Sequence, residues 1–271
     1  MDPIDEQAAD SAPASEPVVV RVESAEPDLV ADRAWLLGAL GLEERGDAWL
    51  ITFPHRSAAV RAMATLATFG PVREVSGEVD VDWVATARPH ARSHEVGPFV
   101  VHPPWITPEV GAGPLALVID PGPTFGHGGH PTTQLLLRHL PTAVESEGSV
   151  LDVGCGSGVL AIAAARLGAR AVTAIDVDAA AVTTTLANAH RNRVTIDATT
   201  TPLGETVGRF DLVLTNLTAA DLAPLAPHLR RVAKGRLLVS GLLVDQSVSG
   251  LEDLTTIDRQ DGWVLADLRC R

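Results

Sequence analysis

Residues 150–158 read Val-Leu-Asp-Val-Gly-Cys-Gly-Ser-Gly, a short apolar run that leads directly into a glycine-rich turn. The next residues, 159–167, are rich in Ala and Leu and stand before Gly168, so they predict a helix with a glycine C-cap. A second apolar run, residues 171–175, ends at Asp176. This order predicts a βαβ unit with an acidic residue at the tip of its second strand.

The glycine spacing indicates what the turn binds. Gly154, Gly156 and Gly158 would let a ligand lie against bare backbone, and Asp176 could accept hydrogen bonds from ribose hydroxyls. The dinucleotide pattern G-x-G-x-x-G/A requires a small residue where this chain has Val159. The pattern G-x-G-x-G better suits S-adenosylmethionine, which carries a ribose and an adenine but no phosphate. The turn therefore predicts a nucleoside-type cofactor. The alternative is a tight strand-to-helix connection without a ligand.

Composition limits the class of protein. The chain has 271 residues, 46% of them hydrophobic, which is enough for one large domain or two modest ones. Its net charge of -13 argues against a nucleic-acid binder but leaves a basic protein partner open. Two cysteines are too few for a disulfide framework, and no apolar stretch reaches the roughly 20 residues of a membrane span. We therefore expect a cytoplasmic protein without a membrane segment or metal site.

The pattern of apolar runs and breakers predicts the domain organisation. Strands at 18–22, 48–53 and 72–79 alternate with helices at 27–40 and 57–68, an order typical of a small α+β, ferredoxin-like domain. The predicted segments are a disordered lead-in at 1–17, this small domain at 18–80, a turn-rich linker at 81–114 and the cofactor-binding α/β domain at 115–271.

The segment from Asp120 to Thr133 precedes the cofactor strand and holds too many Gly and Pro residues for a regular element. Thr132 or Thr133 is a plausible N-cap for a helix over residues 134–140, which Pro141 would end. This loop could bring hydroxyls and backbone N–H groups to the cofactor pocket. The alternative is a structured loop without chemistry.

Asn216 follows the strand predicted at residues 210–215. Ligands of open α/β sheets lie beyond the carboxyl ends of the strands, so Asn216 should lie at the mouth of the same pocket as Asp176. The alternative is an N-cap of the following helical stretch, which Pro224 and Pro227 should break or kink.

Several motifs resemble those of a known family, the ribosomal protein L11 methyltransferases, from about Asp82 to the C-terminus. They are Asp120-Pro121-Gly122, Phe125-Gly126, His130-Pro131-Thr132-Thr133, residues 152–158, Asp176-Val177-Asp178, Asn216 and Ser240-Gly241. The chain departs from the family at His127 and Gly129, where threonines are usual, and at Thr124, where alanine is usual.

The resemblance implies a Rossmann-like, seven-stranded class I methyltransferase sheet, preceded by a small substrate-recognition domain. It also implies S-adenosyl-L-methionine as cofactor and methyl transfer to lysine side chains and α-amino groups of ribosomal protein L11. Asn216 is the predicted catalytic residue, and no general base is assigned. The predicted cofactor-binding residues are Thr133, Gly154, Gly156, Gly158, Asp176 and Asn216. The alternatives are a methyltransferase for another protein or a small molecule, and a non-catalytic cofactor-binding protein.

Overall fold

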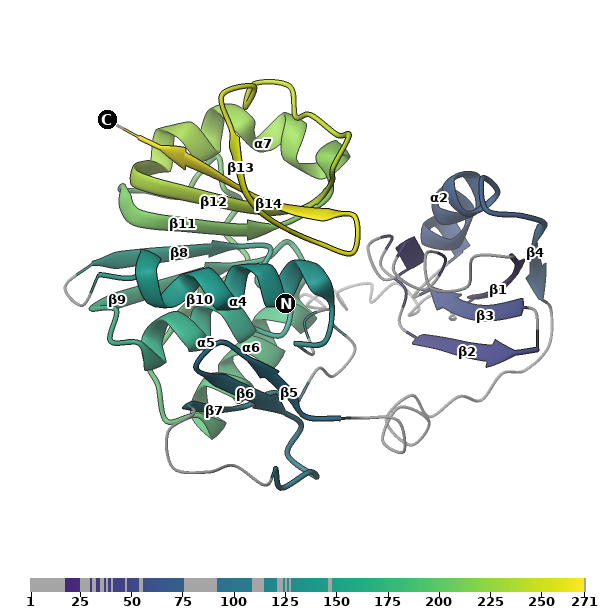
Figure 1. Ribbon diagram of the computed structural model, residues 1–271, viewed down its shortest axis with the longest axis horizontal. Helices are drawn as coiled ribbons and strands as arrows, with labels where there is room; N and C mark the ends of the chain where they lie inside the picture. Colours follow the sequence, from purple (N-terminus) through teal and green to yellow (C-terminus); the bar gives the residue numbers. More distant parts are fainter. Residues whose placement is uncertain are drawn as a thin grey trace, which may run out of the picture. The chain divides into compact units, whose positions relative to one another are not determined.

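The computed structural model divides into two compact units, residues 1–80 and residues 81–271, and each is described by itself (Figure 1). The structure describes residues 18–24, 30, 33–34, 37, 39, 41–46, 48–53, 56–75, 92–108, 115–120, 124, 126, 128–145 and 148–270. No helix in these ranges is long and apolar enough to cross a membrane.

The N-terminal unit is a four-stranded antiparallel sheet covered by a helix. Its strands occur in the order β2-β3-β1-β4, which is the order of a ferredoxin-like module. The elements are β1 (Val18–Glu23), β2 (Gly41–Arg45), β3 (Ala48–Phe53), α2 (Arg56–Leu66) and β4 (Val72–Val75). Apolar side chains of α2, including Ala59 and Leu66, pack on Val20 and Phe53 of the sheet.

Strand β2 was missing from the prediction, because its charged sequence, Gly-Leu-Glu-Glu-Arg, lacks the alternation of a half-buried strand. Antiparallel pairing with β3 stabilises it nonetheless. The predicted lead-in at 1–17, most of the helix at 27–40 and the end of the strand at 72–79 lie outside the described residues.

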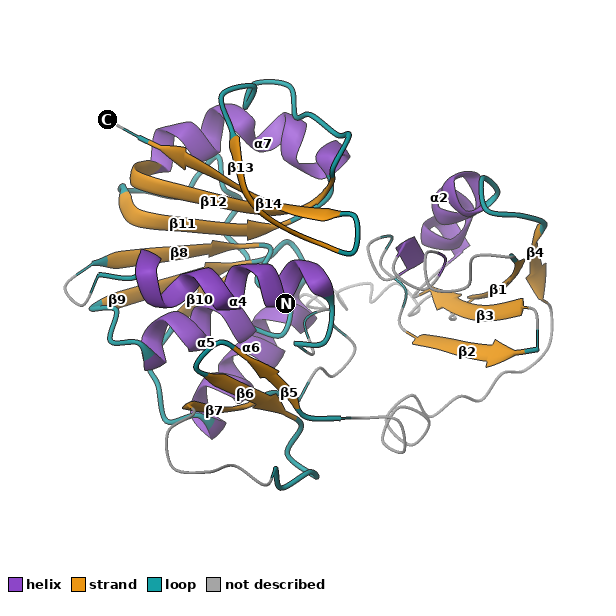
Figure 2. Cartoon of the chain, viewed as in Figure 1, coloured by secondary structure: helices purple, strands orange, loops and turns teal. Residues whose placement is uncertain are grey.

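The larger unit confirms the predicted seven-stranded sheet (Figure 2). The strand order is β10-β9-β8-β11-β12-β14-β13, and β14 runs antiparallel to both of its neighbours while the other pairs are parallel. The strands are β8 (Ser149–Val153), β9 (Ala171–Ile175), β10 (Asp197–Thr199), β11 (Phe210–Asn216), β12 (Ala233–Leu243), β13 (Thr255–Gln260) and β14 (Trp263–Arg269). The strand order reverses beside β8, where open α/β sheets bind their ligands.

Four helices pack on this sheet. Helix α5 contacts both α4 and α6, while α7 covers β11 and β12. Their bounds are α4 (Pro131–Ala143), α5 (Val159–Arg166), α6 (Ala179–Arg191) and α7 (Ala219–Val232). One face of α7, which carries Leu222 and Leu229, is fully buried in a core with Val213 and Val239 of the sheet.

Proline does not end helices where the sequence indicated. Helix α7 continues through Pro224 and Pro227, which lie on its exposed side, although each proline removes one helical hydrogen bond. Burial of its apolar face outweighs those losses. Helix α4 likewise continues past Pro141, and it begins at Pro131 with His130, not a threonine, as the N-cap. Proline at the first helical position has no N–H to leave unpaired.

The segment predicted as a linker contains two strands of a small sheet. Strands β5 (His94–Val96), β6 (Phe99–His102) and β7 (Leu115–Val118) occur in the order β5-β6-β7, and β6 is buried along its whole length. Because β6 pairs in parallel with β7, residues 94–102 are part of the larger unit and not a linker. Residues 81–91 and 109–114 lie outside the described residues.

Candidate active site

The glycine turn after β8 is held by backbone geometry that favours glycine. Gly154, Gly156 and Gly158 have φ angles of 75°, 52° and 79°, in the left-handed region. The Gly154 N–H donates to the Ile175 carbonyl at the end of β9 (2.8 Å). A Cβ at Gly158 would lie 2.8 Å from the side chain of Thr185. The turn is therefore a tight, closely packed connection that exposes backbone at the carboxyl edge of the sheet.

Asp176 ties the tip of β9 to this turn. One carboxylate oxygen accepts from the Gly156 N–H (3.0 Å) and the other from the Asp178 N–H (3.0 Å). A carboxylate offers about four acceptor positions, so further donors such as ribose hydroxyls can still bind. The next residue, Val177, is 92% exposed, and this apolar surface beside Asp176 was missed in the sequence. The one sequence feature that could have indicated a role for Val177 is its position between Asp176 and Asp178 in the Asp-Val-Asp motif.

Asn216 ends β11 and reaches the start of α4. Its Nδ2 lies 3.3 Å from Oγ1 of Thr133, a buried side chain. Its Oδ1 is buried and has no hydrogen-bond partner among the described residues. A buried amide oxygen without a donor is costly, so this atom is a ready acceptor for an N–H group of a ligand.

The loop before α4 contacts the glycine turn directly. Ser157 Oγ donates to the Gly126 carbonyl (2.6 Å), and Gly126 has a φ of 109°. At the helix start, the His130 ring accepts from the Thr132 N–H (3.3 Å). Part of this loop lies outside the described residues, namely residues 121–123, Phe125 and His127.

Asn188 of α6 and Asn192, the C-cap of that helix, anchor the beginning of that loop. Asn192 accepts from the Val118 N–H (2.9 Å) and donates to the Val118 carbonyl (2.7 Å). Asn188 accepts from the Asp120 N–H (3.0 Å) and donates to the Asp120 carbonyl (2.8 Å). It also donates to the Ser157 carbonyl (2.9 Å). These amides replace the partner strand that β7 lacks on this side, so loop and turn share one buried network.

Burial controls the titration of two side chains under the turn. It raises the pKa of Asp152 to about 7, an effect opposed by the Ala161 N–H and reinforced by the charge of Asp176. Burial also raises the pKa of Cys155 to about 12, so its thiol stays protonated at neutral pH. This agrees with Cys155 as a small packing residue and not a nucleophile.

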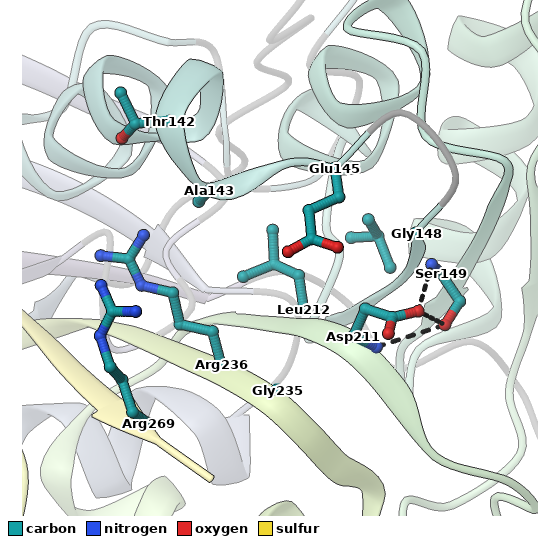
Figure 3. Close-up of a pocket in the computed structure, with 11 residues that line it drawn as sticks. Thr142, Ala143, Glu145, Gly148, Ser149, Asp211, Leu212, Gly235, Arg236 and Arg269 are labelled. Carbon is teal, nitrogen blue, oxygen red and sulfur yellow. Dashed lines mark hydrogen bonds between the residues drawn. The ribbon is translucent and has the colours of Figure 1, made fainter. Parts of the chain in front are cut away.

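A hollow of about 210 Å³ lies at the opposite edge of the sheet from the glycine turn (Figure 3). Glu145, Arg236 and Arg269 point toward it, and Asp211 accepts from the N–H and the hydroxyl of Ser149 (both 2.8 Å). Since Ser149, Asp211 and Arg236 lie near the beginnings of the parallel strands β8, β11 and β12, the hollow is separate from the candidate site.

The sequence matches the family model described as ribosomal protein L11 methyltransferase (PrmA) over residues 56–266. The chain belongs to this family. A ribosomal protein L11 methyltransferase of Geobacter sulfurreducens is 41% identical over 68% of this chain and 64% of the relative. One of Paraburkholderia phymatum is 33% identical over 90% of this chain and 87% of the relative. Across the Geobacter relatives, the matched part of the chain thus spans less than two thirds of their length.

A solved structure of the ribosomal protein L11 methylase from Lactobacillus delbrueckii subsp. bulgaricus has a TM-score of 0.56 and 31% identity to this chain. The similarity covers 64% of this chain and 94% of that one. The class I methyltransferase fold expected from the sequence is therefore confirmed.

The structure brings the six predicted site residues to one edge of the sheet. Hydrogen bonds join Thr133 to Asn216 and Asp176 to Gly156. A Cβ at Gly154 would lie 2.8 Å from the side chain of Leu217, directly after Asn216. Their roles toward cofactor and substrate stay predictions.

Proposed function

We propose that this protein is an S-adenosylmethionine-dependent N-methyltransferase that acts on amino groups of ribosomal protein L11. The observation that carries the proposal is the buried, unpartnered Oδ1 of Asn216 at the edge of the sheet that holds the glycine turn and Asp176. Membership in the L11 methyltransferase family supports the choice of protein substrate.

The residues at this edge fit the proposed cofactor. The backbone of Gly154, Gly156 and Gly158 would accept it closely, Asp176 would bind its ribose, and Val177 would offer an apolar surface to its adenine. When bound, S-adenosylmethionine supplies a methyl group activated by a sulfonium.

Asn216 would orient the acceptor amine. Its Oδ1 accepts an N–H of the neutral amine, and this contact directs the nitrogen lone pair toward the cofactor side of the pocket. With Nδ2 bonded to the Thr133 hydroxyl, Oδ1 is the amide atom left for the substrate. Methyl transfer to nitrogen needs alignment more than a strong base, so positioning should supply most of the rate.

We further propose that the N-terminal unit recognises the protein substrate, as the resemblance implies. A net charge of -13 favours approach of a basic protein. Residues 56–75 of this unit fall within the family match, whereas β1 to β3 precede it. A different protein acceptor is therefore the second candidate.

The variant Asn216→Ala tests the role of the amide. Turnover should fall on the order of a hundredfold, the usual effect of losing one positioned hydrogen bond in an active site. The melting temperature should change little. Calorimetric affinity for S-adenosylmethionine should fall far less than turnover, because the glycine turn and Asp176 keep their predicted cofactor contacts. Gln246→Ala, an exposed amide elsewhere in the unit, is the control and should keep full activity. Near-normal turnover of Asn216→Ala would refute the assignment.

A further inference from the structure

The hairpin of β13 and β14 has a rigid turn that points two side chains in defined directions. Asp261 and Gly262 form a two-residue loop with φ angles of 50° and 80°, the combination of a type I′ turn. Gln260 and Trp263 flank this loop as a cross-strand pair. Their positions are therefore fixed relative to each other by a short, well-defined connection.

Both flanking residues contact the start of α4. Gln260 Nε2 donates to Gln134 Oε1 (2.9 Å), and Gln134 Nε2 donates to the Gly129 carbonyl (3.1 Å). Trp263, which is 2% exposed, packs edge-on against the His130 ring, with 5.3 Å between the ring centroids. The hairpin thus holds residues 129–134 at two points, one polar and one aromatic.

The segment that the hairpin holds includes a predicted active-site residue. Thr133 lies one residue before Gln134, and its hydroxyl is the partner of Asn216. On the other side, Gly128 has a φ of 88°, and two successive glycines give this part of the loop little stiffness of its own. The link from Gln260 through Gln134 to Gly129 supplies a restraint that the local sequence lacks.

The same hairpin makes a second contact with α4 that does not reach the loop. Asp258 lies 3.0 Å from Nε2 of His139 and 3.6 Å from the guanidinium of Arg138. These residues lie more than one helical turn beyond Gln134. The polar contacts of Gln260 and Asp258 thus join the same two elements, and of these two only the contact of Gln260 continues into the active-site loop.

We propose that Gln260 and Gln134 are positioning residues that hold the loop at 129–133, and with it Thr133, in the geometry that Asn216 needs to orient the acceptor amine. This inference rests on the proposed function. The two side chains should act more on turnover than on cofactor affinity, since neither belongs to the glycine turn or to Asp176 and Thr133 is only one of the predicted cofactor contacts. Misplacement of reacting groups by about 1 Å can lower a rate a hundredfold, so even a small loosening of the loop is measurable.

The test compares Gln260→Leu, Gln134→Leu, the double variant and Asp258→Ala. Each leucine replaces an amide by an apolar group of similar size. Each single leucine variant should lower kcat about tenfold and leave KM for S-adenosylmethionine within about twofold. The double variant should be no worse than either single one, because the two residues form one link. Asp258→Ala should lower the melting temperature but keep kcat within about twofold.

Full kcat in Gln260→Leu, or an equal loss of kcat in Asp258→Ala, would overturn the inference, because the hairpin would then contribute only to stability. Hydrogen exchange gives a readout that needs no turnover. Amides of residues 128–134 should exchange faster in Gln260→Leu than in the wild type or Asp258→Ala. If wild-type protein transferred no methyl group, the proposed function would fail, and unchanged exchange in Gln260→Leu would separately refute the positioning link.

Discussion

Asp152 shows how one buried side chain makes stability depend on pH. Its folded-state pKa of about 7 exceeds the ordinary value of 3.8, so the folded protein binds a proton that the unfolded chain has released. The free energy of unfolding therefore falls as pH rises from about 4 to about 7 and is then constant. A shift of roughly three units corresponds to about 4 kcal/mol.

Asp152→Asn should abolish this dependence, because an amide oxygen can still accept from the Ala161 N–H without a charge. Urea unfolding at pH 4, 5.5 and 8 should show the variant gaining stability over the wild type as pH rises. Asp211→Asn, measured also at pH 2 and 3, is a control of opposite sign. Hydrogen bonds from Ser149 lower the pKa of Asp211 to about 2, so its contribution is lost as pH falls from about 4 through 2. A pH-independent difference for Asp152→Asn would contradict this account.

Single residues were predictable where the signal is local. The glycine turn and Asp176 follow from spacing within about 30 residues, and the structure joins them through the Gly156 N–H (3.0 Å). The roles of Asn188 and Gln134 were not predictable, because their partners lie far away in the sequence and only the fold brings them together.

At the scale of elements, the hairpin turn offers a clean test of backbone strain. A Cβ at Gly262 would meet no atom within 4 Å, so a substitution there changes only the cost of a φ of 80°. Gly262→Ala should lower the free energy of unfolding by about 1 kcal/mol, and Gly262→Asn by less, because asparagine tolerates positive φ. Denaturant midpoints measure both. Equal effects of the two variants would contradict a type I′ turn under strain.

Element boundaries were predicted best where burial and propensity agree. Residues 159–167 were predicted as a helix, and α5 ends one residue earlier. The prediction was wrong where tertiary contacts override the local pattern. Pairing stabilises the charged strand β2, and burial of one face keeps α7 unbroken through two prolines.

At the scale of the whole molecule, the α/β class and the seven-stranded sheet were predictable because βαβ units repeat along the sequence. The sheet of β5, β6 and β7 was not, since a segment rich in turns separates β6 from its partner β7. The position of the candidate site at the carboxyl edge follows from the topology alone. The identity of the methyl acceptor does not follow from the topology, because substrate recognition depends on the residues of particular surfaces and not on the fold.

The central claim is that this edge binds S-adenosylmethionine and transfers its methyl group to a protein amine. The most direct measurement is a calorimetric titration with S-adenosylmethionine and with NADH, followed by incubation with radiolabelled S-adenosylmethionine and ribosomal protein L11. The account predicts binding of S-adenosylmethionine, no preference for NADH and label on L11. Label on another protein would redirect the choice of substrate, whereas preferential binding of NADH would contradict the central claim.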